Sequence, residues 1–216
     1  MNSVDYRLYL VTDRKQVGGQ GLVAAVRQAL EGGVRAVQLR EKDLSDREVY
    51  KLGCELRVLT RDFGAGLFIN DRADLALAVE ADGVHLTQTS YSAGEARKII
   101  GQSGIVGVST HSMDQARKAE EEGADFITLG PVFETPSKKA YGPPVGIPLL
   151  EQVLQVVDIP VFAIGGIKKG NAPSVLHAGA HGVALISGIL AASDVKKEAW
   201  EFINLIHGKD KMISKV

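Results

Sequence analysis

The sequence predicts a single (β/α)8 barrel, the TIM barrel of the α/β class, and three observations support this prediction. Eight short apolar runs alternate with helix-like stretches along nearly the whole chain. Near-continuous apolar strands alternating with helices are typical of a parallel sheet covered by helices, and eight such units favour closure into a barrel. The competing open nucleotide-binding sheet lacks its Gly-x-Gly-x-x-Gly fingerprint, because Val11-Thr12-Asp13-Arg14 follows the first run.

Strands are expected wherever a run rich in apolar and β-branched residues is bounded by turn residues. In chain order these runs are Arg7–Thr12, Arg35–Arg40, Gly66–Asn70, Gly83–Leu86, Ile105–Ser109, Phe126–Leu129, Pro160–Ile164 and Gly182–Ile186. The barrel domain is predicted to span residues 1–207, and residues 208–216, with three lysines, are expected to form a flexible solvated tail.

Helices are expected between the strands, since apolar residues there recur at the spacing of one helix face. Two such sets are Leu22, Val23, Val26, Ala29 and Leu30, and Val49, Leu52, Leu56 and Leu59. The Ser-x-x-Glu/Gln pattern of a capping box marks three helix starts, Ser45 to Glu48, Ser92 to Glu95 and Ser112 to Gln115. Each follows a predicted strand and its loop, where a crossover helix should begin.

The composition is that of an ordinary soluble globular protein. The 216 residues are 45% hydrophobic and 24% charged, with a net charge of -1 that gives no reason to expect a nucleic-acid partner. No apolar run approaches membrane-spanning length and no basic-then-apolar leader opens the chain, so a cytoplasmic protein without a membrane partner is expected. The lone Cys54 cannot form an internal disulfide, and assembly into a homo-oligomer stays open.

The segment from Gln38 to Lys42 carries the clearest chemical signal. Side chains of a strand alternate between two faces, so Gln38, Arg40 and Lys42 are expected on one side and Leu39 and Glu41 on the other. A barrel core normally takes aliphatic residues at inward positions. Two cations at the end of a buried strand therefore indicate an anionic small-molecule substrate.

Asp71 follows the third predicted strand and has two interpretations. It could cap the following helix. A carboxylate that faces Arg40, Lys42 and Lys138 across a barrel mouth could instead hold Mg²⁺ bridging phosphate oxygens, since this cation needs only one or two protein carboxylates. Histidines offer less: neither His85 nor His111 has a clear acid/base partner in the sequence, and no pair has metal-ligand spacing.

Two later segments resemble anion sites. The Thr135-Pro136-Ser137-Lys138 stretch lies in the longest predicted loop, where its hydroxyls and cation could close over an anion or simply face water. Gly165-Gly166 and Ser187-Gly188 follow the seventh and eighth predicted strands, where such barrels bind phosphate through backbone N–H groups. A tight strand-to-helix turn is the alternative reason for the glycine pair.

Taken together, these motifs resemble the thiamine phosphate synthases and the related thiazole tautomerases over roughly residues 7–206. The shared segments, in the family's order, are Gln38-Leu39-Arg40-Glu41-Lys42, Ile69-Asn70-Asp71-Arg72, Ala81-Asp82-Gly83-Val84-His85-Leu86, Gly107-Val108-Ser109-Thr110-His111-Ser112, Gly130-Pro131-Val132-Phe133, Thr135-Pro136-Ser137-Lys138, Ala163-Ile164-Gly165-Gly166-Ile167 and Ile186-Ser187. The series is far more specific than any one of its members.

The resemblance implies a Mg²⁺-dependent transferase. It would join 4-amino-2-methyl-5-(diphosphooxymethyl)pyrimidine to 4-methyl-5-(2-phosphooxyethyl)thiazole, giving thiamine phosphate and pyrophosphate by a dissociative route. It implies catalytic roles for Arg40, Lys42 and Lys138. By the same resemblance the pyrimidine diphosphate would be bound by Gln38, Leu39, Arg40, Glu41, Lys42, Asn70, Ser109 and Lys138, and the thiazole phosphate by Thr135, Pro136, Ser137, Gly166, Ile186 and Ser187.

The chain departs from the family pattern at its expected second metal ligand. The synthases usually carry an aspartate where this chain has Ser90, so Asp71 is the one carboxylate left for Mg²⁺. Two alternatives therefore stay open: a thiazole tautomerase, and a regulator that binds thiazole phosphate or thiamine phosphate without turnover. A tautomerase would need no metal, but its expected histidine is replaced by Pro131.

Overall fold

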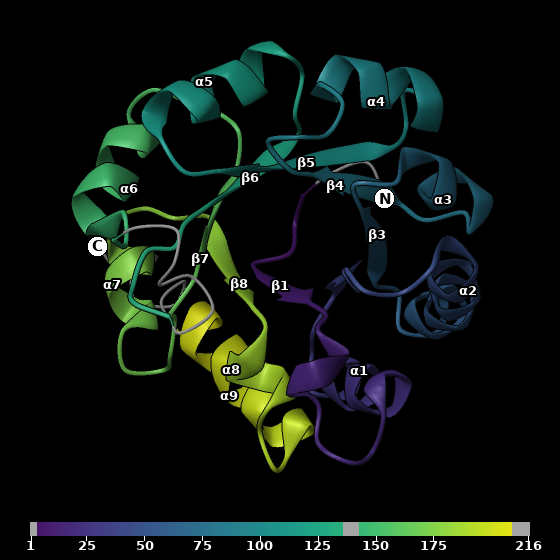
Figure 1. Ribbon diagram of the computed structural model, residues 1–216. Helices are drawn as coiled ribbons and strands as arrows, with labels where there is room; N and C mark the ends of the chain where they lie inside the picture. Colours follow the sequence, from purple (N-terminus) through teal and green to yellow (C-terminus); the bar gives the residue numbers. More distant parts are fainter. Residues whose placement is uncertain (1–3, 136–142, 209–216) are drawn as a thin grey trace.

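The computed structural model describes residues 4–135 and 143–208, in which eight parallel strands form a closed barrel in the order β1 to β8 (Figure 1). The strands are β1 (Leu8–Val11), β2 (Ala36–Leu39), β3 (Gly66–Asn70), β4 (Gly83–Leu86), β5 (Ile105–Thr110), β6 (Phe126–Leu129), β7 (Val161–Ile164) and β8 (Gly182–Leu185). Every predicted strand is found, with ends that differ by at most one residue. The predicted (β/α)8 barrel is confirmed.

Helices surround the barrel on its outer side (Figure 1). They are α1 (Leu22–Glu31), α2 (Asp46–Asp62), α3 (Ala73–Ala78), α4 (Ala93–Ile100), α5 (Met113–Glu121), α6 (Gly146–Leu154), α7 (Ala172–His177), α8 (Ser187–Leu190) and α9 (Val195–His207), with the short 3-10 helix η1 (Arg14–Gln16) after β1. A short helix, α8, thus separates β8 from the final helix α9. The predicted tail lies, apart from Gly208, outside the described residues.

Two of the three expected capping boxes form in full, at the starts of α2 and α4. The third forms only in part. The Ser112 hydroxyl accepts a hydrogen bond from the Gln115 backbone N–H at 3.2 Å, but the Gln115 side chain accepts from the backbone N–H of His111 at 2.8 Å. Ser112 still caps α5, and the glutamine side chain ties down the loop before it.

Alternation along the strands divides the interior into two cores. Outward residues such as Leu10 of β1 and Val84 of β4 pack against the helices in one large apolar cluster. Inward residues form a second, smaller cluster inside the barrel, consisting of Tyr6, Tyr9, Val11, Ala36, Phe68, Ile105, Phe126, Phe162 and Ala184. The aromatic rings of this inner cluster form a floor beneath the carboxyl end of the barrel.

The seam between β1 and β8 closes the barrel. Leu8 pairs with Val183 in parallel register. The Arg7 Nε–H donates to the carbonyl of His181 at 2.8 Å, and the His181 Nε2 lies 3.0 Å from the carbonyl of Tyr6. Strand pairing and side-chain hydrogen bonds therefore join the two ends of the described barrel.

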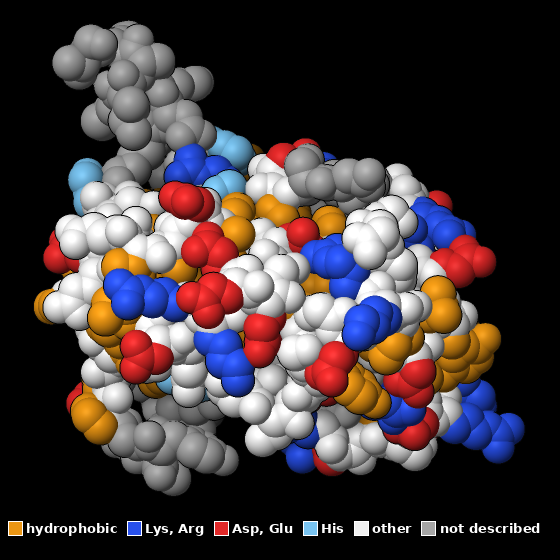
Figure 2. Space-filling view, turned by 90° about the horizontal axis from the view of Figure 1, so that it is seen from above, with side chains coloured by type: hydrophobic (Ala, Val, Ile, Leu, Met, Phe, Trp, Pro, Cys, Tyr) orange, Lys and Arg blue, Asp and Glu red, His pale blue; other side chains and the backbone are white. Residues whose placement is uncertain are grey.

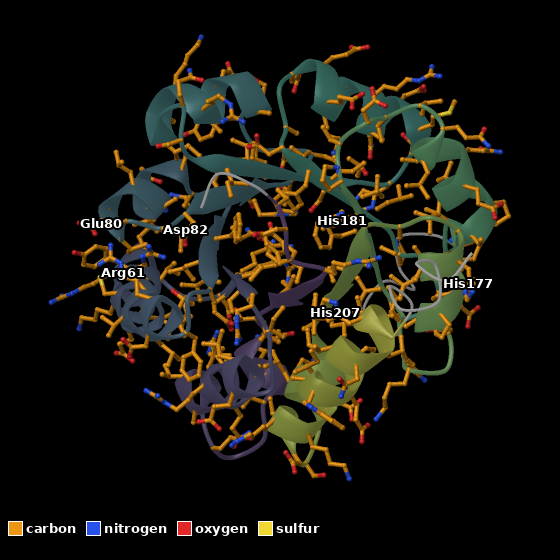
Figure 3. All side chains as sticks on the ribbon, turned by 180° about the vertical axis from the view of Figure 1, so that it is seen from behind. Arg61, Glu80, Asp82, His177, His181 and His207 are labelled. Atoms are coloured by element: carbon orange, nitrogen blue, oxygen red, sulfur yellow. The ribbon has the colours of Figure 1, made fainter. Side chains whose placement is uncertain are left out.

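An aspartate just before β4 braces the amino end of the barrel. Figure 3, which views the molecule from behind, labels Asp82 on this face. Its carboxylate accepts from the backbone N–H of Leu67 in β3 at 2.8 Å and from the Arg57 guanidinium of α2 at 2.6 Å. One carboxylate thus joins a helix, a strand and the turn before the next strand.

The same brace recurs two strands later. Asp125, just before β6, accepts from the backbone N–H of Val106 in β5 at 2.6 Å and from the Arg97 guanidinium of α4 at 2.7 Å. Arg97 also donates to the carbonyls of Gly104 and Gly123, each at 2.9 Å. Because one guanidinium binds three acceptors from two loops, this brace has more contacts to lose than a surface ion pair.

The outer surface mixes charges of both signs. Figure 2 shows Lys and Arg side chains interspersed with Asp and Glu over one side of the barrel, as the net charge of -1 suggests. Within the described residues, every helix is too short or too polar to cross a lipid bilayer.

We expect Asp125→Ala to lower the free energy of unfolding by about 1–3 kcal/mol, because the Val106 N–H and the Arg97 guanidinium would each lose an acceptor. Urea denaturation at neutral pH measures the change. Asp62→Ala is the control, since Asp62 is exposed at the end of α2 and has no ion pair within the described ranges. Equal unfolding free energies for the two variants would contradict the brace.

Candidate functional site

A chain of buried polar side chains crosses the barrel above the aromatic floor. The Gln38 side-chain N–H donates to the Tyr9 hydroxyl oxygen at 3.1 Å, and that oxygen lies 3.4 Å from Nδ1 of His85. Nε2 of His85 is 3.0 Å from the hydroxyl oxygen of Ser109. The chain links four strands, β1, β2, β4 and β5. It joins Gln38 and Ser109, both predicted site residues, through Tyr9 and His85, to which sequence reasoning gave no site role.

His85 is fully enclosed at 2% exposure. Burial lowers the pKa of its imidazole to about 3, and the nearby charges of Asp71 and Arg40 act on it in opposite directions. A Cβ at Gly107 would lie 2.6 Å from the imidazole Nδ1 and 2.3 Å from the ring of Phe126. His85 is therefore a neutral hydrogen-bonding group at pH 7, and it fits only because position 107 is glycine.

The backbone at Asp71 turns the carboxylate toward the loop after β4. Asp71 adopts a left-handed conformation, with φ of 62°, and its N–H donates to the carbonyl of His85 at 2.9 Å. Aspartate tolerates this conformation better than most residues. The N-cap of α3 is Arg72, so the alternative of Asp71 as helix cap is wrong.

The Asp71 carboxylate is surrounded by donors. Its Oδ1 accepts from the backbone N–H and the hydroxyl of Thr87, each at 3.0 Å, and from the Ser90 hydroxyl. Its Oδ2 accepts from the Asn70 side chain at 2.8 Å. The structure thus brings Asn70, Asp71 and Ser90 together.

This set fits a magnesium ion that keeps most of its own water. Mg²⁺ is usually held by one or two carboxylates, with waters and substrate phosphates completing its six ligands. Asp71 supplies one carboxylate, and the Thr87 and Ser90 hydroxyls donate hydrogen bonds to it. Within the described ranges, no three Asp, Glu, His or Cys side chains cluster as an all-protein metal site would require.

The charged residues after β2 do not follow the two-face alternation that the sequence predicted for Gln38 to Lys42. The strand ends at Leu39, so the period of two does not extend to Lys42. Glu41 is 8% exposed, and its carboxylate accepts from the Thr12 hydroxyl at 2.7 Å and from the Arg14 backbone N–H at 3.1 Å. Glu41 therefore fastens this segment to the loop after β1.

Arg40 and Lys42 have no carboxylate partner within the described residues. Arg40 is half-buried, and its backbone N–H donates to the Thr12 hydroxyl at 2.9 Å. Lys42 is exposed. The charges of Arg40 and Asp71 both act on the His85 imidazole. Two cations without a partner at a strand's carboxyl end are suited to an anionic ligand.

The predicted phosphate site is partly described. Gly165 and Gly166 both have positive φ, of 93° and 67°, and a Cβ at Gly166 would lie 2.5 Å from the carbonyl of Glu134. Close packing against the loop after β6 thus requires glycine there. Ser187 is exposed at the first position of α8, and Ile186 precedes it.

Thr135 is half-buried at the edge of the described part of the chain. The predicted site residues Pro136, Ser137 and Lys138 lie outside the described residues. The expected approach of Lys138 to Arg40 and Asp71 therefore stays a prediction.

Sequence reasoning missed Tyr9. A signal was available, because Tyr9 is the one hydroxyl-bearing side chain in a strand that otherwise reads Leu-Leu-Val. Its position two residues before Val11 places it on the inward face of β1.

A closed β/α barrel with polar and cationic residues at the carboxyl ends of its strands has the architecture of the β/α-barrel enzymes, whose active sites lie at that face. The family described as thiamine monophosphate synthase matches residues 8–189. The chain belongs to this family. The predictions of a thiamine phosphate synthase family member and of a transferase are confirmed.

Individual relatives agree. A protein of Geobacter sulfurreducens is 53% identical over 95% of this chain and 97% of its own length. The thiamine-phosphate synthase of Syntrophomonas wolfei is 45% identical over 92% of this chain and 95% of its own. The solved structure of thiamine phosphate pyrophosphorylase from Pyrococcus furiosus is 40% identical, with a TM-score of 0.86 over 94% of this chain and 96% of that one.

Stability is expected to fall as the pH drops below about 6.5. Unfolded His85 binds a proton near that pH, whereas the folded state does not until about pH 3. This residue alone then costs about 1.4 kcal/mol per pH unit across that window. Burial lowers the pKa of His181 as well, and it acts in the same direction.

Urea unfolding of the wild type and of His85→Gln, at several pH values between about 7 and 4, measures this dependence. The variant should lose stability less steeply with falling pH. Parallel curves for the two proteins would show that His85 is not the source.

Proposed function

We propose that this chain condenses 4-amino-2-methyl-5-(diphosphooxymethyl)pyrimidine with 4-methyl-5-(2-phosphooxyethyl)thiazole. The bond between the pyrimidine methylene carbon and the diphosphate oxygen breaks, and pyrophosphate leaves with the electron pair. The thiazole nitrogen then donates its lone pair to the methylene cation. The products are thiamine phosphate and pyrophosphate.

The observation that carries this proposal is a pair of cations at the carboxyl end of β2 in a chain of this family, Arg40 and Lys42, neither of which has a carboxylate partner among the described residues. A dissociative step develops negative charge on the leaving diphosphate. Fixed cations stabilise that charge more than they stabilise the ground state, and one lost donor of this kind costs about 3–4 kcal/mol. Together with Lys138, they would supply the catalytic charge, so the step needs no protein nucleophile.

The two substrates are assigned to separate groups of residues. We assign the pyrimidine diphosphate to Gln38, Leu39, Arg40, Glu41, Lys42, Asn70, Ser109 and Lys138, and the thiazole phosphate to Thr135, Pro136, Ser137, Gly166, Ile186 and Ser187. Because the Glu41 carboxylate is held by Thr12 and Arg14, its contribution is to fix the backbone that carries Arg40 and Lys42.

Asp71, with the Ser90 and Thr87 hydroxyls beside it, would hold Mg²⁺. When bound, this ion would neutralise charge on the diphosphate oxygens. We place the reaction in the cytoplasm, with no nucleic-acid or membrane partner, and leave a homo-oligomer open.

Product formation tests the proposal. Purified protein is incubated with both phosphorylated substrates over a Mg²⁺ titration, with an EDTA control, and thiamine phosphate is measured. Metal-dependent product is expected. If the folded protein makes none at saturating Mg²⁺, the synthase proposal fails. Conversion of an isomeric thiazole would then test the tautomerase, and binding of thiamine phosphate would test the regulator.

Arg40→Ala is expected to reduce kcat by about 100- to 1,000-fold, since it removes a charge aimed at the leaving group. The KM for thiazole phosphate should change much less, because that substrate binds elsewhere. Arg117→Ala, an exposed arginine of α5, serves as the matched control and should leave both constants unchanged. A similar loss in the two variants would remove Arg40 from its role.

Asp71→Asn should raise the Mg²⁺ concentration for half-maximal binding by about tenfold or more, because a neutral amide oxygen is a weaker ligand than a carboxylate. Calorimetric titration with Mg²⁺ and pyrophosphate measures this Mg²⁺ affinity without turnover. Asp114→Asn, on the exposed first turn of α5, is the control. Unchanged Mg²⁺ affinity in Asp71→Asn would place the ion elsewhere.

A further inference from the structure

We propose that Tyr9 and His85 are positioning residues that fix which hydrogen-bonding atoms of Gln38 and Ser109 face the pyrimidine ring. This inference rests on the proposed function and deepens it. It assigns the preference for an aminopyrimidine to a buried relay, Gln38–Tyr9–His85–Ser109, of which the two middle members do not touch the substrate.

The first step concerns Gln38. Its side chain is 2% exposed, and its amide nitrogen donates to the Tyr9 hydroxyl oxygen at 3.1 Å. An amide has one donor end and one acceptor end, so this bond fixes its orientation. The carbonyl oxygen Oε1 accepts no hydrogen bond from the described residues. It is therefore the end left for a ligand, and it can only accept.

The second step concerns Tyr9. Its ring is fully buried and wedged edge-on between Phe68 and Phe126, with each pair of centroids 5.4 Å apart. Since its oxygen already accepts from Gln38, its own proton needs an acceptor. Within the described chain, the His85 Nδ1 at 3.4 Å is the available acceptor. Tyr9 therefore donates to His85.

The third step concerns His85 and Ser109. A neutral imidazole that accepts at Nδ1 carries its proton on Nε2 and donates there. The Ser109 oxygen, 3.0 Å from Nε2, accepts that proton, and the Thr128 hydroxyl lies 3.5 Å from the same oxygen and 3.4 Å from Nε2. With its lone pairs directed at these donors, Ser109 keeps its own O–H for a ligand.

The relay thus presents one acceptor, Gln38 Oε1 on β2, and one donor, the Ser109 O–H on β5. An aminopyrimidine offers the complement, an exocyclic N–H donor and ring nitrogens that accept. The 4-oxo analogue inverts this pattern, with a carbonyl acceptor and a ring N–H donor. A site with fixed polar groups rejects such an analogue because its buried groups would stay unpaired.

Tyr9→Phe removes the hydroxyl that orients Gln38 and leaves the ring in place. Tyr6→Phe is a closely matched control. Tyr6 belongs to the same aromatic cluster, at 5% exposure, and its buried hydroxyl has no hydrogen-bond partner within the described residues. Its ring centroid is 5.9 Å from that of Tyr9. The two variants delete the same atom from neighbouring rings, one inside the relay and one outside it.

The experiment compares binding of the pyrimidine diphosphate and its 4-oxo analogue to full-length protein with Mg²⁺ and no thiazole, by calorimetry. The wild type and Tyr6→Phe should prefer the amino compound by about 20-fold or more, and Tyr9→Phe should lose at least about fivefold of that ratio. The KM for thiazole phosphate should stay within about twofold in all three. A merely structural loss would weaken both pyrimidines equally.

Three results would overturn the inference. These are an unchanged ratio in folded Tyr9→Phe, an equal fall in Tyr6→Phe, and a wild-type preference for the 4-oxo compound, which would mean that the relay runs in the opposite direction. If Tyr9→Phe does not fold, His85→Gln breaks the same relay from its other side and should show the same loss. Absence of turnover in a wild type that keeps the ratio would reject the synthase and leave the relay standing.

Discussion

Eight parallel strands close around a small interior, and each inward side chain must share that volume with those of the other strands. Here large rings and missing side chains complement one another. A Cβ at Gly83 would lie 3.0 Å from the ring of Phe68, and one at Gly107 would lie 2.3 Å from the ring of Phe126. The lower interior is thereby filled to contact by Tyr6, Tyr9, Phe68, Phe126 and Phe162.

The polar relay exists because this floor excludes water from below. In such a dry setting a hydrogen bond is stronger, and an unpaired polar group is more costly, than at a surface. Gln38, Tyr9, His85 and Thr128 are all nearly inaccessible to solvent, and each has at least one polar partner. These four polar side chains therefore form one connected set, whereas the buried Tyr6 hydroxyl has no hydrogen-bond partner within the described residues. Replacing one member therefore changes the hydrogen-bond donors and acceptors available to the next.

The fold was predictable because its signals are local. A short apolar run predicts each strand. A serine followed three residues later by a glutamate predicts the helix starts at Ser45 and Ser92. The inward direction of Gln38 also followed from the period of two. The direction of the Lys42 side chain did not follow from it, because the strand ends at Leu39 and loop residues obey no such period.

The rest of the site depends on contacts that no short stretch of sequence encodes. Tyr9 and His85 are 76 residues apart, and their meeting needs the register of four strands at once. The left-handed turn at Asp71 is likewise set by its bond to the carbonyl of His85 on the next strand. Sequence reasoning could name Asp71 as a ligand or as a helix cap, and only the fold shows that Arg72, not Asp71, is the cap.

The seam between β1 and β8 has a consequence for the order of assembly. Neighbouring strands elsewhere in the barrel are joined by a single crossover, whereas Leu8 and Val183 meet only after the whole chain has been brought round. The entropy lost in closing a loop grows with its length, so this pairing is the most costly one to form. We therefore expect the barrel to grow from open sheets of adjacent strands and to become a ring last, when β1 pairs with β8.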